Sequence, residues 1–244
     1  MNTAAPPLEI CIACDSQEEA LLNARAAASG GADRLECCAS MHVGGLTPDP
    51  RIIEEIREAV PTKVAVLAMV RPRGGAFEWN ATEADTMQQS IQDLAAAGAD
   101  GVVSGALRSG TIDVALTRKL ISLARHLSLD FTFHRAIDAV EDRTEVLNTL
   151  MDLGCQRILT AGTRWGATDG ALDGIKELTR TARQLKGRME IVVGGGVSAV
   201  SLPQLWDVLS HHEKISFHAY SAAMTGGQTD AGKVAALRQV IAMD

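Results

Sequence analysis

The sequence predicts an α/β fold in which residues 1–244 form a single-domain (β/α)8 barrel, the TIM barrel. Eight short apolar segments rich in β-forming residues recur along the chain. The intervals between them are long enough for the crossover helix that two parallel strands require. The length of 244 residues also matches this fold, which usually has about 250.

The expected strands follow one another at Leu8–Ala13, Asp33–Cys38, Lys63–Val70, Gly101–Ser104, Asp130–His134, Gln156–Thr160, Arg188–Val193 and Lys214–His218. Helices are expected between them. Gln17–Ser29 and Ala84–Ala97 combine helical periodicity with many Ala, Leu and Glu residues. Glycine stands shortly before three of the strands, at Gly31, Gly98 and Gly154, where it ends a helix.

An open doubly wound sheet is the alternative arrangement of alternating strands and helices. That fold more often has the glycine motif G-x-G-x-x-G after its first strand. Here residues 11–16 read Cys-Ile-Ala-Cys-Asp-Ser instead. The closed barrel is therefore favoured.

Composition and charge exclude several classes of function. The net charge is −7 and the aromatic residues are only three Trp, one Tyr and four Phe, so we expect no nucleic-acid partner. The apolar runs fall far short of the about 20 residues that span a bilayer, and residues 1–7 do not read as a signal peptide, so we expect no membrane partner. Five cysteines are an odd number without a disulfide framework, which favours the cytoplasm.

Charged side chains are expected inside the barrel and at its mouth. Side chains alternate along a strand, so the apolar face packs on the helices and the other face points into the lumen. Nine polar residues fall on the lumen face or follow a strand: Glu9, Arg34, Glu36, Arg71, Arg73, His134, Arg135, Asp138 and His218. They form either a structural ion-pair network or a catalytic site at the carboxyl ends of the strands, where barrel sites lie.

An enzyme would use these groups in two ways. The arginines Arg34, Arg71 and Arg73 can clamp a carboxylate or a phosphate through paired hydrogen bonds. A carboxyl group such as Glu36 or Asp138 can act as general base or acid, while a histidine relays a proton. This chemistry suits an isomerase or a lyase that acts on a small anionic metabolite.

Glycine and threonine near two further strand ends suggest a place for an anion. Gly195 and Gly196 follow the seventh strand, and their backbone amides can bind an anionic group, as phosphate sites in barrels do. Thr160 ends the sixth strand and can form a second wall of the same site. The alternative is that the glycines only make a tight turn.

Several motifs along nearly the whole chain resemble the CutC family of copper homeostasis proteins. The most specific are Arg-Pro-Arg-Gly-Gly at 71–75 and Phe-His-Arg-Ala-Ile-Asp at 133–138. The resemblance implies a TIM barrel, a cytoplasmic location, a homodimer or higher homo-oligomer, and a relation to copper. The chain departs from the family pattern at Val43, Ala76 and Ala161, and in a short connection over 219–230.

The implied copper directs attention to the sulfur atoms. Cu(I) prefers thiolate and thioether ligands. Cys11, Cys38 and Met69 lie on the predicted lumen face of three successive strands, and neighbouring strands are about 4.8 Å apart. These sulfurs can converge on a Cu(I) ion, or they can simply pack the lumen as small, soft side chains.

Overall fold

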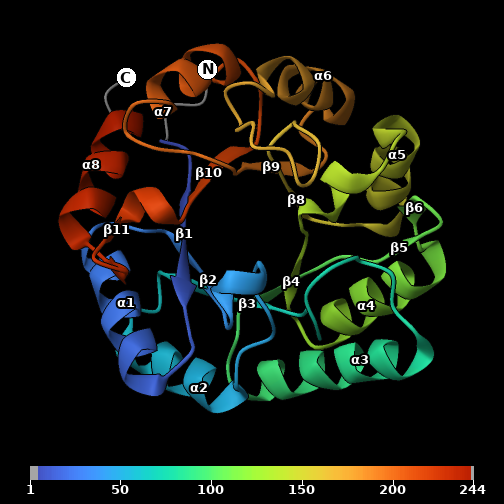
Figure 1. Ribbon diagram of the computed structural model, residues 1–244, viewed down its shortest axis with the longest axis horizontal. Helices are drawn as coiled ribbons and strands as arrows, with labels where there is room; N and C mark the ends of the chain where they lie inside the picture. Colours follow the sequence, from blue (N-terminus) through green and yellow to red (C-terminus); the bar gives the residue numbers. More distant parts are fainter. Residues whose placement is uncertain (1–4, 243–244) are drawn as a thin grey trace.

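The computed structural model describes residues 5–242 and confirms the barrel (Figure 1). Parallel strands close into a ring in the order β1-β10-β9-β8-β7-β4-β3-β2. Their bounds are β1 (Leu8–Ala13), β2 (Arg34–Cys38), β3 (Ala65–Met69), β4 (Gly101–Ser104), β7 (Asp130–Phe133), β8 (Arg157–Thr160), β9 (Glu190–Val193) and β10 (Ile215–Ala219). Each of these eight strands lies within one residue of an expected segment or inside it.

A ring of helices surrounds the barrel, as a parallel sheet requires. The helices are α1 (Gln17–Ser29), α2 (Pro50–Ala59), α3 (Ala81–Ala96), α4 (Val114–His126), α5 (Arg143–Leu153), α6 (Ile175–Leu185), α7 (Leu202–Leu209) and α8 (Ala231–Ile241). In the part of the chain that the structure describes, no helix is both long enough and apolar enough to cross a membrane.

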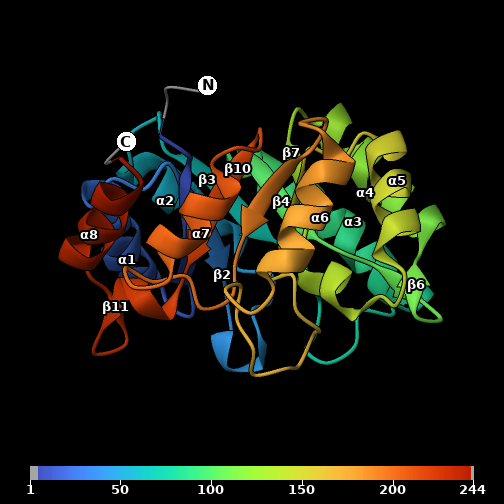
Figure 2. The same ribbon diagram turned by 90° about the horizontal axis from the view of Figure 1, so that it is seen from above.

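Short elements decorate the loops. Two small hairpins, β5 (Leu107–Arg108) with β6 (Thr111–Ile112) and β11 (Met224–Thr225) with β12 (Gln228–Thr229), follow β4 and β10. Three 3₁₀ helices follow strands of the barrel: η1 (Met41–Val43), η2 (Arg135–Ala139) and η3 (Ser221–Ala223). Figure 2 shows these strand-to-helix loops gathered along one edge, while both termini lie toward the other.

Helix caps and one left-handed backbone position explain where elements begin or end at other residues than expected. The third helix begins at Ala81, three residues earlier than predicted, because Asn80 and Glu83 form a capping box. The fifth strand of the barrel ends at Phe133, because the His134 side chain already caps η2. The strand expected from Lys214 begins at Ile215, since Lys214 has a positive φ of 56°.

The alternation of side chains separates two groups of buried residues. Leu8, Ile10, Leu35 and Cys37 belong to the large apolar core that includes residues of the surrounding helices. The lumen holds a second, small cluster of Cys11, Cys38, Leu67, Met69 and Val103, with Met41 and Tyr220 packed against it. This division confirms that parity identified the lumen face of β1 and β2.

Candidate metal and ligand site

A cavity of about 200 Å³ opens at the carboxyl ends of the strands. Its lining residues come from the strands and from the loops that follow them: Cys11, Glu36, Cys38, Met41, Gly44, Met69, Arg71, Phe77, His134, Arg135, Leu159, Trp165, His218 and Tyr220. Eight of the residues singled out in the sequence meet here: Cys11, Glu36, Cys38, Met69, Arg71, His134, Arg135 and His218. Barrel enzymes and binding proteins place their sites at this same face.

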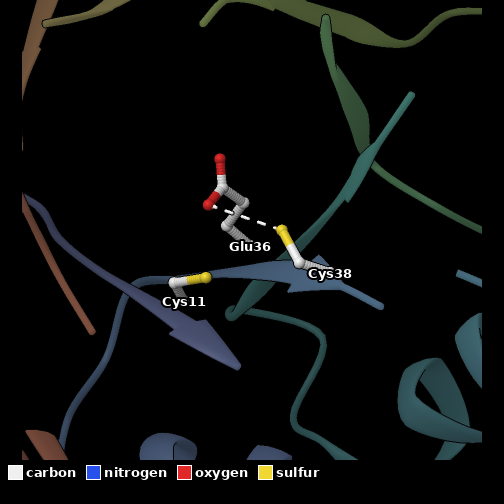
Figure 3. Close-up of side chains that lie close together, drawn as sticks. All are labelled: Cys11, Glu36 and Cys38. Atoms are coloured by element: carbon white, nitrogen blue, oxygen red, sulfur yellow. Dashed lines mark hydrogen bonds between the residues drawn. The ribbon is translucent and has the colours of Figure 1, made fainter. Parts of the chain in front are cut away.

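Sulfur atoms form one wall of the cavity. Cys11 and Cys38 come from the neighbouring strands β1 and β2, and their Sγ atoms lie within 4.8 Å of each other and of a Glu36 carboxylate oxygen (Figure 3). Met69 ends β3 and belongs to the same lumen cluster. The Met41 Sδ atom lies 3.9 Å from Cys11 Sγ. We call Cys11, Cys38, Met41 and Met69 the sulfur cluster.

Sequence parity missed Met41, because this residue belongs to η1 rather than to a strand. The alternation of side chains applies only to extended backbone, and it ends where β2 ends at Cys38. The sequence signal for Met41 is its place three residues after Cys38, the last residue of β2.

The two thiols of the sulfur cluster have opposite pKa shifts. The hydrogen bond from Cys38 lowers the pKa of Cys11 to about 6, even though burial opposes this shift, and the nearby His218 contributes in the same direction. The same hydrogen bond, together with burial, raises the pKa of Cys38 well above its usual value. Cys11 is therefore the more acidic thiol of the pair.

His218 lies between two carboxyl groups on the floor of the cavity. Its Nδ1 atom is 2.9 Å from Glu9 Oε1, and its Nε2 atom is 3.7 Å from Glu36 Oε2. Burial disfavours the imidazolium, but Glu36, Cys11 and Glu9 outweigh burial and raise the pKa of His218 well above its usual value. Since Glu9 accepts at Nδ1, the second ring nitrogen is directed to Glu36.

The two carboxyl groups beside His218 have opposite pKa shifts. Burial raises the pKa of Glu9, but Arg34 and His218 outweigh it and lower this pKa to about 2. Burial, together with the negative charges of Cys11 and Glu9, raises the pKa of Glu36 well above its usual value. Pairs of carboxyl groups with divergent pKa values are typical of acid–base sites.

Replacing Glu36 with Gln is expected to stabilise the protein increasingly as the pH rises above about 4.5. A carboxyl group whose pKa is raised on folding stabilises the fold fully below its unfolded pKa, and this contribution is lost as the pH rises toward the folded pKa. Urea unfolding of the wild type and of Glu36→Gln between pH 4 and pH 8 measures the effect. The exposed Glu54→Gln is the control. A difference between wild type and Glu36→Gln that does not change with pH would contradict the expectation.

Arg34 does not line the cavity, but lies in an ion-pair network that reaches the cavity residue His218 through Glu9. Its Nε atom is 3.0 Å from Glu9 Oε2, and one terminal nitrogen is 2.7 Å from both Glu190 Oε1 and Ser216 Oγ. Arg34 is the first residue of β2, so it lies toward the amino-terminal end of the barrel, away from Cys38. This geometry matches the structural interpretation of the lumen charges.

The three predicted clamp arginines do not come together. Arg71 lines the cavity, where its terminal nitrogens donate to four loop carbonyl groups, those of Val43, Gly44, Gly45 and Gly75. Arg73 points elsewhere, because its Nε donates to Glu83 at 2.6 Å and its guanidinium packs on the Trp79 ring. The expectation of a three-arginine clamp is therefore corrected to a single arginine at the cavity.

Asp138 is buried beneath the mouth and does not line the cavity. Its carboxylate accepts hydrogen bonds from Thr160 Oγ1 and the Ala161 backbone, and it pairs with Arg135 at 2.8 Å and Arg143 at 3.2 Å. All of its oxygen atoms are thus engaged within the protein. Asp138 and Thr160 fix the loops after β7 and β8, and the structure does not bring either side chain to the cavity.

The glycine segment after β9 also lies outside the residues that line the cavity. The next helix, α7, begins only at Leu202, after an intervening turn. Gly195 and Gly196 have φ values of 94° and 73°, which favour glycine. The Gly195 carbonyl accepts from Ala171. The tight-turn alternative describes the backbone here, because no helix starts where the amides could act together.

Comparison with known proteins gives consistent results. The model of the CutC family matches residues 7–215. A CutC family protein from Xanthomonas axonopodis pv. citri is 38% identical over 218 residues, which cover 89% of this chain and 85% of the relative. The copper homeostasis protein cutC homolog from Homo sapiens is 37% identical over 199 residues, covering 81% of this chain and 68% of the relative.

Solved structures agree with the fold. The CutC protein from Streptococcus agalactiae superimposes with a TM-score of 0.75 and 28% identity, covering 87% of this chain and 98% of that one. The 3-keto-L-gulonate-6-phosphate decarboxylase from Vibrio cholerae has a TM-score of 0.65 at 15% identity, covering 98% of each chain. At that identity the likeness concerns the barrel alone.

Proposed function

Because this chain belongs to the CutC family, we propose that it serves copper homeostasis by binding Cu(I) at the sulfur cluster. Two of the proteins named above, the relative from Homo sapiens and the solved structure from Streptococcus agalactiae, carry the words copper homeostasis in their names. The observation that carries the proposal is the pairing of Cys11 and Cys38 on one cavity wall, with their sulfur atoms within 4.8 Å. Copper would be cargo of this protein, held and released, rather than a resident cofactor.

The residues of the sulfur cluster fit Cu(I) by their chemistry. Thiolates and thioethers are soft ligands that select Cu(I) over harder cations. Cys11, whose pKa is lowered to about 6, is the more acidic thiol and gives up its proton to Cu(I) more readily. Cys38 would lose its proton on binding, so affinity should rise with pH. Met41 and Met69 supply thioethers beside these thiols.

Titration of the reduced protein with Cu(I), in competition with a chromogenic Cu(I) chelator, tests the proposal. We expect one Cu(I) per chain, and X-ray absorption of the loaded protein should show copper surrounded by sulfur. Mg²⁺ under the same conditions is the control for a hard ion, and it should not bind at the sulfur cluster. Failure to compete with the chelator, or a copper shell of nitrogen and oxygen alone, would contradict it.

Acid–base catalysis on a small anionic metabolite is the second candidate function. The contact that favours it is the 3.7 Å approach of His218 to Glu36 on the cavity floor, between groups whose pKa values are both raised. Such a pair can move a proton to or from a bound molecule, as an isomerase or a lyase requires. If the chain is such an enzyme, Glu36→Gln should abolish turnover of the metabolite and leave Cu(I) binding in place.

The cellular setting is also part of the proposal. All five cysteines are free thiols, which supports the reducing cytoplasm. The resemblance to CutC proteins supports a homodimer or a higher homo-oligomer. Light scattering of the purified chain distinguishes these states from a monomer.

A further inference from the structure

Arg71 carries a buried charge that no carboxylate in the described chain neutralises. Its side chain is only 2% exposed, and every hydrogen bond of its guanidinium goes to a neutral backbone carbonyl. Its Nε atom is buried without a partner. Burying a cation is costly unless an opposite charge accompanies it. The Arg71 site is thus electrostatically incomplete, and it lines the cavity.

His134 presents a second buried donor without a partner. The ring is 3% exposed, and its Nδ1 atom accepts a hydrogen bond from the Ala136 backbone at 3.2 Å. In a neutral imidazole the other nitrogen then carries the proton. Burial, with help from the charge of Arg71, lowers the pKa of His134 to about 3, so the ring is neutral. The Nε2–H group has no partner among the described residues.

Packing around the His134 ring fixes its position. A side chain at Gly105 would lie 2.6 Å from the ring atoms Cε1 and Nδ1 of His134, so the absence of one there makes room for the ring. Phe77 contacts both residues, with its ring centre 5.0 Å from the Arg71 guanidinium and 4.8 Å from the centre of the His134 ring. Arg71 and His134 are therefore held on one aromatic wall.

One part of the cavity wall is apolar, and the cavity leaves little room. Phe77, Leu159 and Trp165 line it, and the Phe77 and Trp165 rings are 5.0 Å apart. The volume of about 200 Å³ is smaller than the pockets that take large ligands. An occupant must therefore be small, and one part of it can be apolar.

We propose that the cavity binds a short-chain monocarboxylate. Its carboxylate would neutralise Arg71 and accept the hydrogen bond of His134 Nε2–H, while its aliphatic tail would contact Phe77 and Trp165. One uncompensated cation matches one negative charge. A phosphate is less suitable, because barrel phosphate sites rely on loop amides and helix starts, and the glycine segment after β9 does not line this cavity.

A carboxylate can bind in this cavity whether or not Cu(I) binds at the sulfur cluster. If the chain is an acid–base enzyme, the second function proposed above, the carboxylate is the group that its substrate would present to Arg71 and His134. Cys38→Ser separates the two proposals: we expect the variant to lose Cu(I) affinity and to keep carboxylate binding. Loss of both in Cys38→Ser, with both kept in the control Cys14→Ser outside the cavity, would contradict separate sites for the two ligands.

Calorimetry of the copper-free full chain with acetate, butyrate and inorganic phosphate tests the proposal. We expect saturable binding of butyrate, stronger than that of acetate, and no saturable binding of phosphate. Quenching or a shift of tryptophan fluorescence should accompany it, because Trp165 lines the cavity. Chloride at equal ionic strength controls for general salt effects. Butyrate binding no stronger than chloride, or a preference for phosphate, would overturn the proposal.

His134→Asn is the informative variant. The Asn carboxamide oxygen can still accept the Ala136 amide at the start of η2, since Asn is a good N-cap residue, but it offers no donor at the Nε2 position. We expect butyrate affinity to fall by at least about 10-fold, the usual effect of losing a hydrogen bond to a charged group. Arg73→Gln is the matched control, because it removes a neighbouring positive charge outside the cavity. Equal loss in both variants would overturn the proposal.

A measurement on the unaltered chain keeps the test decisive if His134→Asn does not fold. The histidine ring nitrogens, labelled with ¹⁵N, report the proton on Nε2 directly. We expect the His134 Nε2–H resonance to shift when butyrate is added and to remain unchanged with phosphate. A His134 resonance that butyrate does not perturb would exclude the proposed contact.

Discussion

Replacing both Cys11 and Cys38 with Ser is expected to weaken Cu(I) binding by more than about 100-fold, because a hydroxyl is a poor ligand for a soft cation. The two Sγ atoms lie within 4.8 Å of each other on the cavity wall. The thioethers of Met41 and Met69 remain, but they carry no charge to balance Cu(I). Competition with a chromogenic chelator measures the change in affinity.

The chain provides a matched control for this experiment. Cys14 and Cys37 are also buried, but they belong to the large core between barrel and helices rather than to the lumen. The double variant Cys14→Ser/Cys37→Ser removes the same number of thiols and should keep the affinity of the wild type. Thermal melting shows whether each variant is folded. Equal affinities in both double variants would place copper elsewhere.

Replacing Arg34 with Met is expected to lower the free energy of unfolding by about 3–5 kcal/mol, the usual cost of removing one partner from a buried ion pair. Arg34 neutralises Glu9 and Glu190, at 3.0 Å and 2.7 Å, and Glu9 is wholly buried. Methionine fills most of the volume but removes the guanidinium, so that Glu9 keeps only His218 and Glu190 keeps only the Ser216 hydroxyl among their side-chain partners described here. Urea unfolding followed by circular dichroism at pH 7 measures the loss.

Arg51→Met is the control for this substitution. Arg51 also pairs with a carboxylate, Asp49, at 3.2 Å, but its side chain is 86% exposed. An exposed pair contributes at most about 1 kcal/mol, so the variant should unfold nearly like the wild type. If Arg34→Met cost no more than Arg51→Met, the network in the lumen would not be a structural one.

The fold could be predicted because the patterns that indicate its strands and helices each extend over only a few residues. Each strand of the ring was visible as a short apolar segment, and helix-ending glycines such as Gly98 and Gly154 preceded several strands. Small errors arose where a side chain overrides the pattern, as when Asn80 and Glu83 start α3 early. Asn80 and Glu83 have the spacing of a capping box, so the start of α3 can be predicted from the sequence.

The candidate site was predictable only in part. Parity correctly separated Cys38 from Cys37, since alternation along an extended strand is a property of the backbone itself. The alternation of side chains does not continue into loops. It therefore could not predict that Arg71 lines the cavity while Arg73 pairs with Glu83. Those directions depend on partners that come from distant parts of the chain.

The barrel, the polar lumen and the cysteines that face it could be predicted from residue patterns, because periodicity and composition act within a few residues. Which polar groups find partners depends on the folded arrangement of the whole chain. It engages Arg34 with Glu190, 156 residues away, and leaves Arg71 and His134 incomplete at the cavity. Whether a buried charge is neutralised depends on contacts across the closed barrel, and such contacts exist only after the chain has folded.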